Sequence, residues 1–167
     1  INYVKQRIYD FIDRIKSLNS YYEVKCEFCG EMGIIQKVLF DREDWKTDPQ
    51  ITKIYYKCKC NKKVLDKDPN LFDYYNLNLN YSCTNIKDIE LITNSRLAVY
   101  KGEKISNIFT SRNFALLDIM IGYMNEYEDD IMECIRYIIM SSIHLSKITD
   151  THSNSQWPLW TPKSGCI

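Results

Sequence analysis

Hydrophobic residues recur every three or four positions in two stretches of the chain, and this spacing predicts helices. The first stretch covers residues 2–18, and its apolar face is formed by Val4, Ile8, Phe11, Ile12, Ile15 and Leu18. The second covers residues 111–147 and holds two apolar faces in succession, with Thr110 or Ser111 as the N-cap of its first helix. We therefore expect an N-terminal amphipathic helix and a C-terminal helical hairpin.

Shorter apolar segments lie between these helices and indicate strands. Residues 33–40 and 51–57 predict a β-hairpin, while residues 66–95 suggest a long ordered loop with one short strand at 86–92. Residues 149–167 form an irregular tail. Its Trp157 and Trp160 can stack on bases. Tryptophans of this kind more often cover a hydrophobic core, here that of the helical hairpin.

The predicted fold class is α+β, a small zinc-ribbon β-hairpin module flanked by an N-terminal helix and a C-terminal helical hairpin. Its four regions are the N-terminal helix at 1–20, the ribbon at 21–65, a loop-rich connector with short strands at 66–110, and the hairpin with its tail at 111–167.

Composition and charge narrow the class of protein. The 167 residues carry 22 Lys and Arg against 22 Asp and Glu, so overall charge predicts no polyanion partner. No apolar run approaches the ~20 residues that a membrane span needs, and we expect no membrane partner. Seven cysteines, some in close pairs, suggest metal binding in a reducing compartment, expected to be the cytoplasm. A chain that begins at Ile1 suggests an excised part of a larger protein.

Two close cysteine pairs carry the main chemical signal. Cys26 and Cys29 are separated by two residues, Cys58 and Cys60 by one, and a hairpin-length segment lies between the pairs. Four thiolates are the ligand set of a structural zinc ribbon, and they leave no open position for a substrate. The alternative is four ordinary buried or free cysteines, and the tight second pair also allows a redox or degenerate site. Cys134 lacks such a partner and is expected in the core.

Lysines surround the second cysteine pair. The segment from Ile51 to Lys63 contains no acidic residue. Its lysines are the candidate nucleic-acid contacts: Lys53, Lys57, Lys59, Lys62 and Lys63. These lysines have two possible roles. Four thiolates and one Zn²⁺ leave a formal charge of about −2, which the lysines can compensate. They can instead contact the phosphates of a nucleic acid.

No self-contained active site is visible in the chain. The five glycines form no phosphate or AdoMet loop, and no Asp-Pro-Pro-Tyr sequence occurs. The unpaired His144 and His152 do not make a catalytic pair. The sequence alone therefore leaves it uncertain whether the chain is part of an enzyme, and it points to no catalytic residue.

The segment Ile105-Ser-Asn-Ile-Phe-Thr-Ser-Arg-Asn-Phe-Ala-Leu-Leu117 resembles the "dlFT-x-RnL-x-aL" stretch of a family of adenine-specific DNA methylases. In that family the stretch follows a cysteine-rich ribbon and precedes a helical hairpin, the order found here. The ends of the hairpin and the segment Trp157-Pro-Leu-Trp160-Thr-Pro162 are also similar, so the resemblance covers most of residues 21–163.

The resemblance implies a bacterial restriction–modification enzyme that transfers methyl groups from AdoMet to adenine N6, with a flipped base. The AdoMet and catalytic motifs would lie in the parent enzyme, and this chain would be a non-catalytic insert beside its catalytic domain. Double-stranded DNA is the implied partner. Arg112 can reach phosphate or a base edge, or can instead pin the preceding loop through backbone carbonyls. The alternatives are a purely structural insert and an independent zinc-ribbon adaptor for protein or RNA.

Overall fold

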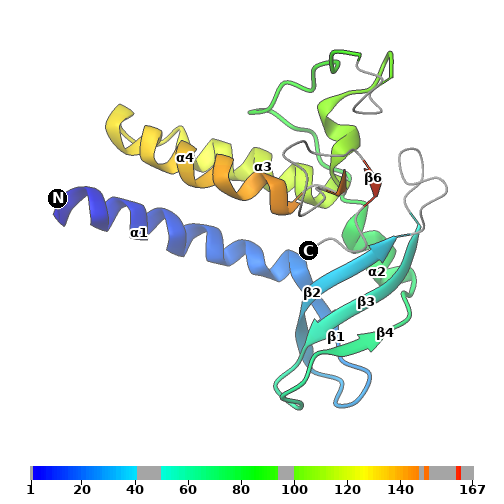
Figure 1. Cartoon of the computed structure of the whole chain (residues 1–167). Helices are drawn as coiled ribbons and strands as arrows, with labels where there is room; N and C mark the ends of the chain where they lie inside the picture. Colours follow the sequence, from blue (N-terminus) through cyan, green and yellow to red (C-terminus); the bar gives the residue numbers. More distant parts are fainter. Residues whose placement is uncertain (1, 41–49, 94–99, 147–148, 151–160, 163–167) are drawn as a thin grey trace.

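The chain folds into a four-stranded antiparallel sheet at one end of three long helices, in agreement with the predicted α+β class (Figure 1). The computed structural model describes residues 2–40, 50–93, 100–146, 149–150 and 161–162. Within these residues, no helix has the length and apolarity needed to cross a membrane.

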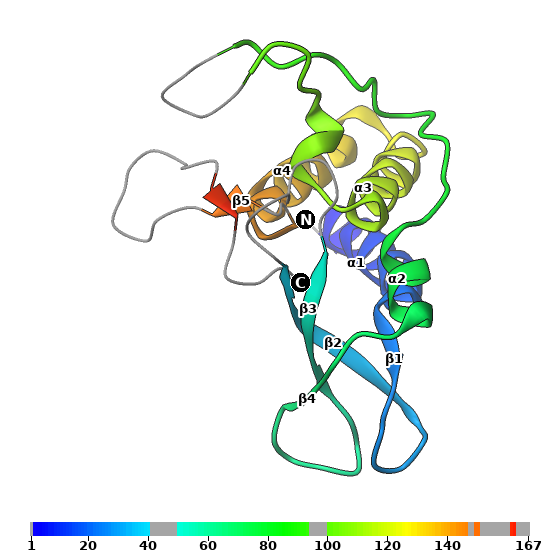
Figure 2. The ribbon, with the colours of Figure 1, turned by 90° about the vertical axis from the view of Figure 1, so that its right-hand side faces the viewer.

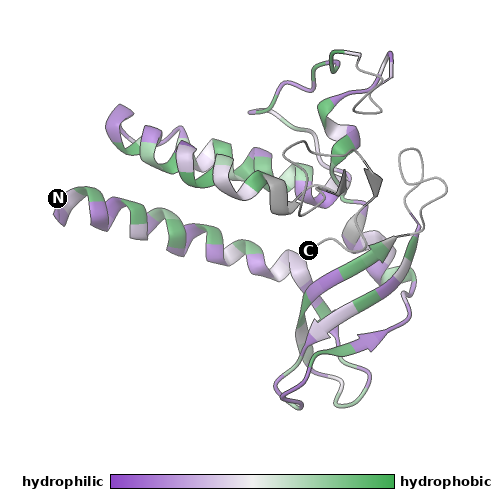
Figure 3. Cartoon of the chain, in the orientation of Figure 1, coloured by the Kyte–Doolittle hydropathy of each residue, from purple (hydrophilic) through white to green (hydrophobic). Residues whose placement is uncertain are grey.

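The three long helices share one hydrophobic core. α1 (Asn2–Lys16) packs against α4 (Asp129–Ser146) and α3 (Ser111–Met124), and hydrophobic segments run along all three (Figure 3). Phe11 of α1 is fully buried and meets the edge of the Tyr127 ring, with 6.1 Å between ring centroids. Phe11 is the one buried residue of α1, and Val4 and Ile15 pack against the same core while only partly buried. The buried residues of this core are Phe11, Phe109, Phe114, Leu117, Met124, Ile131, Ile135 and Ile139.

The sheet has the order β1-β2-β3-β4. The predicted hairpin is formed by β2 (Met32–Phe40) and β3 (Ile51–Lys57), and two short edge strands, β1 (Glu23–Lys25) and β4 (Leu65–Lys67), extend it. One face carries a second hydrophobic core, whose buried residues are Val24, Cys26, Ile35, Val38, Ile51, Ile54, Tyr56, Cys58 and Leu65.

The segment that follows β4 is more regular than the sequence suggested. α2 (Leu71–Leu77) occupies part of the expected loop, because Asn70 and Asp73 form a capping box in which each side chain accepts a backbone N–H of the other. Asp73 also pairs with Lys67 at 2.8 Å, and both side chains are buried. The short strand expected at 86–92 is reduced to an isolated bridge within the described residues.

Short elements complete the fold. 3₁₀ segments η1 (Ser17–Tyr22) and η3 (Ile105–Ile108) precede the sheet and α3, and β5 (Thr149–Asp150) pairs with β6 (Thr161–Pro162). Trp157 and Trp160 lie outside the described residues.

The expectation of a buried Cys134 is wrong: this side chain is exposed, because the buried stripe of α4 runs through Ile131, Ile135 and Ile139.

The connector is fastened to α3 by one fully buried carboxylate, Asp118. It accepts the backbone N–H groups of Thr84, Asn85 and Ile86 at 2.6–3.1 Å, and the hydroxyl of Tyr81 at 3.1 Å. Burial alone would raise the pKa of Asp118, but these donors outweigh it and hold the pKa below its ordinary value. The ionised carboxylate therefore organises a segment that has little regular structure.

We expect Asp118→Asn to destabilise the fold by about 3 kcal/mol at pH 7, since an amide NH₂ would face N–H donors. A carboxyl with a depressed folded pKa stabilises above its unfolded pKa of about 4. The difference between wild type and variant should shrink as pH falls below that value, when measured by urea unfolding. Asp13→Asn, on the exposed face of α1, is the control; an equal loss there would contradict this role for Asp118.

Candidate metal centre

The structure brings the four cysteines of the two predicted pairs into one cluster. Their Sγ atoms all lie within 4.8 Å of one another, with 3.7 Å between Cys26 and Cys60 and 3.5 Å between Cys29 and Cys58. Four sulfurs at ~2.3 Å from a tetrahedral Zn²⁺ would be ~3.8 Å apart. The cluster therefore has the dimensions of a tetrathiolate site and can hold a metal ion.

Backbone geometry shapes the first pair. The turn after β1 is closed by a hydrogen bond from the Gly30 N–H to the Cys26 carbonyl at 3.0 Å, and by another from the Cys26 N–H to the Glu31 carbonyl at 2.8 Å. Gly30 has φ +77°, a left-handed conformation that glycine adopts without a steric penalty. The turn thus directs both sulfurs to one side.

The second pair follows β3 and uses a tighter turn. A single backbone bond, from the Asn61 N–H to the Cys58 carbonyl at 3.2 Å, closes it among the described residues. The one-residue spacer still brings Cys58 and Cys60 into the cluster, with Cys58 buried and Cys60 exposed. The short spacing is therefore compatible with four ligands.

The sulfurs differ in how readily they become thiolates. Burial alone would raise the pKa of Cys26, but the N–H of Cys29, the hydroxyl of Tyr56 and the N–H of Phe28 lower it to about 6. The adjacent thiol of Cys58 and burial raise the pKa of Cys60 to about 12. Crowded thiols resist the loss of all their protons, and a divalent cation would remove that resistance.

The predicted lysines fall into two groups. Lys53 pairs with Asp66 at 2.9 Å and with Asp68 at 3.5 Å, so two neighbouring carboxylates already neutralise it. The other four are exposed and form no ion pair within the described part of the chain: Lys57, Lys59, Lys62 and Lys63.

The loop that joins β3 to β4, and carries most of these lysines, lies beside the loop of the first cysteine pair at the end of the sheet farthest from the helices (Figure 2). Phe28, between the first two cysteines, is 75% exposed there. Glu27 and Glu31 are also exposed on that loop, so the end of the ribbon is mixed in charge but has more lysines than glutamates.

Arg112 lies in the interior, with 1% of its surface exposed. Its guanidinium stacks on the Tyr22 ring at 4.3 Å and donates to the Tyr21 carbonyl at 3.2 Å. Beside it, the Tyr22 hydroxyl donates to the side chain of Asn113 at 3.0 Å. This position matches the alternative in which the arginine holds backbone, and it lends no support to a nucleic-acid contact by Arg112.

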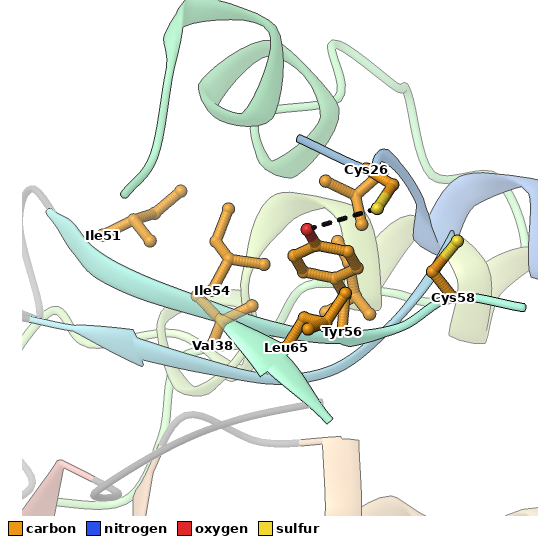
Figure 4. Close-up of a cluster of buried hydrophobic side chains, with 9 residues drawn as sticks. Cys26, Val38, Ile51, Ile54, Tyr56, Cys58 and Leu65 are labelled. Carbon is orange, nitrogen blue, oxygen red and sulfur yellow. Dashed lines mark hydrogen bonds between the residues drawn. The ribbon is translucent and has the colours of Figure 1, made fainter. Parts of the chain in front are cut away.

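Sequence reasoning missed one residue of the centre, Tyr56. It is fully buried in the sheet core, and its hydroxyl lies 3.6 Å from the Cys26 sulfur (Figure 4). A tyrosine in an apolar strand carries no sign of such a contact. Only its place two residues before Cys58 could have suggested one.

No protein-family model, curated protein or solved structure matches this chain.

We expect Arg112→Lys to lower the free energy of unfolding by about 2 kcal/mol or more, although it keeps the charge. Lysine cannot both stack flat on Tyr22 and donate in the fork geometry of a guanidinium. Urea unfolding should show the loss, and Arg136→Lys on the exposed surface of α4 should change stability by less than about 0.5 kcal/mol. Equal stability of Arg112→Lys and wild type would show that the buried guanidinium is dispensable.

Proposed function

We propose that the four cysteines bind one structural Zn²⁺ and that the resulting ribbon is a non-catalytic part of an adenine-specific DNA methyltransferase, where it assists DNA binding. The observation that carries the metal assignment is the cluster of four Sγ atoms within 4.8 Å. All-cysteine tetrahedral sites are closed to substrate and contribute folding energy. AdoMet would bind elsewhere in the parent enzyme.

The exposed lysines at the end of the ribbon support DNA contact. Zinc and four thiolates would carry about two negative charges, which Lys57 and Lys59 are placed to offset. Lys62 and Lys63 continue beyond the cysteines into an exposed hydrophilic loop (Figure 3). Their ammonium groups are available to phosphate, and Phe28 at the same end offers an exposed ring to a base.

The exposed side of α2 favours a protein partner as well. Leu71, Phe72 and Tyr75 are all more than half exposed on this one short helix. Apolar residues gathered in this way are typical of contact surfaces. In the proposed enzyme the catalytic domain is the candidate to cover them.

The metal assignment predicts one zinc per chain in protein purified without chelator, measured by elemental analysis. Cys26→Ser should lose the zinc, while Cys83→Ser and Cys134→Ser, whose sulfurs lie outside the cluster, should keep it. Chelator should lower the free energy of unfolding by several kcal/mol, since metal binding is coupled to folding. A metal-free wild-type chain whose stability does not respond to chelator would remove the assignment.

DNA contact predicts binding of a double-stranded oligonucleotide that weakens steeply as salt rises, measured by fluorescence anisotropy. Replacing Lys59, Lys62 and Lys63 by alanine together should reduce affinity about tenfold or more and lower the log–log salt slope by about 2–3. The matched control replaces three exposed lysines of the connector, Lys87, Lys101 and Lys104, and should leave affinity nearly unchanged. No binding at low salt, or equal losses in both triple variants, would contradict a contact at the ribbon.

A further inference from the structure

We infer that Tyr56 is a positioning residue of the metal centre: its hydroxyl donates to the Sγ of Cys26 and holds that ligand toward the other three. The inference rests on the proposed zinc site and adds a residue to it that the cysteine pattern does not reveal.

The direction of the hydrogen bond follows from the partners of the hydroxyl. The Glu27 N–H donates to the Tyr56 oxygen at 3.3 Å, so the oxygen acts as an acceptor there. The one hydroxyl proton is left for the Cys26 sulfur, 3.6 Å from the oxygen, as drawn in Figure 4. Tyr56 thus contacts the first cysteine turn at two consecutive residues.

Packing alone does not explain a tyrosine at this position. The side chain has no exposed surface, and a buried hydroxyl is unfavourable unless it is hydrogen-bonded. Phenylalanine would fill nearly the same space without that requirement. Both hydroxyl contacts given above lead to the metal centre, which ties the group to the site and distinguishes it from the surrounding apolar core.

Strand position gives the contact its structural effect. Tyr56 pairs with Ile35 on β2 and with Leu65 on β4, so it lies on an inner strand of the sheet. The same strand leads directly to Cys58. The hydroxyl therefore links the first cysteine turn to the strand that supplies the second, and it orients Cys26 before a metal binds.

Hydrogen bonds to a metal-bound thiolate also act on the metal. They reduce the electron density on sulfur and fix its direction, and removal of such outer contacts commonly weakens metal affinity 10–100-fold. Cys26 would receive this bond in addition to the N–H groups of Phe28 and Cys29. Several protein groups would therefore orient this one ligand.

The chain offers a matched control in Tyr74. Its hydroxyl donates to the Ile51 carbonyl at 3.0 Å, and its ring packs against the same sheet core. Tyr74→Phe thus removes a hydroxyl and a hydrogen bond from the same core without touching a cysteine. A general loss of core stability would affect both variants, whereas loss of ligand positioning would affect only Tyr56→Phe.

The test compares zinc affinity in wild type, Tyr56→Phe and Tyr74→Phe by competition with a chromophoric chelator, together with the Co²⁺ absorption spectrum of each. We expect Tyr56→Phe to bind zinc at least tenfold more weakly and to shift the thiolate-to-cobalt charge-transfer band. Tyr74→Phe should stay within about twofold of wild type, with an unchanged spectrum. Equal affinity and spectra in all three chains, or equal losses in both variants, would overturn the inference.

A second measurement needs no variant and holds even if Tyr56→Phe fails to fold. In wild-type chain loaded with ¹¹³Cd²⁺, the Tyr56 hydroxyl proton should exchange slowly with water and show scalar coupling to the cadmium through Sγ. A bound cadmium without that coupled proton would overturn the role of Tyr56 and leave the metal site intact. A wild-type chain that binds neither zinc nor cadmium would overturn the proposed site itself.

Discussion

Four sulfur atoms that approach one another within 4.8 Å set the main physical constraint on this molecule. The two edge strands have three residues each and therefore add few backbone hydrogen bonds to the β2–β3 hairpin. The cluster joins the turn after β1 to the turn after β3, so it closes the end of the sheet that lies farthest from the helices. With the proposed metal bound, this closure would also fix the lysine-bearing loop.

The start of β1 is held by a different kind of contact. There the first turn of α3 supplies a buried arginine under Tyr22 and an asparagine that accepts the Tyr22 hydroxyl. Arg112 donates to the Tyr21 carbonyl, as in the alternative role given for it from the sequence, and thereby joins the ribbon to the helices. These contacts attach the ribbon to the helices, and the buried guanidinium of Arg112 is engaged in that attachment.

The sequence predicted elements with strong periodicity or an unambiguous cap. The 3.6-residue spacing located α1, α3 and α4, and Thr110 does cap α3 by accepting the Asn113 N–H. The sequence could not predict α2, because a seven-residue helix shows hardly two turns of pattern. This helix depends instead on the Asn70–Asp73 capping box and the buried Lys67–Asp73 pair. The cysteine cluster could be predicted from spacing alone. The contact of Tyr56 and the burial of Arg112 could not, since both depend on which strand or helix lies opposite.

The division of the interior into two hydrophobic clusters has a consequence for how the chain opens. The sheet cluster and the helix cluster are separate sets of buried residues, connected through η1 and the side chains of Arg112 and Asn113. Parts of a protein with separate cores can lose structure at different free energies. With the proposed metal bound, the ribbon would then be one cooperative unit and the helices another. In native-state hydrogen exchange, amides of β2 and β3 would respond to free metal concentration, while those of α3 and α4 would report a metal-independent opening.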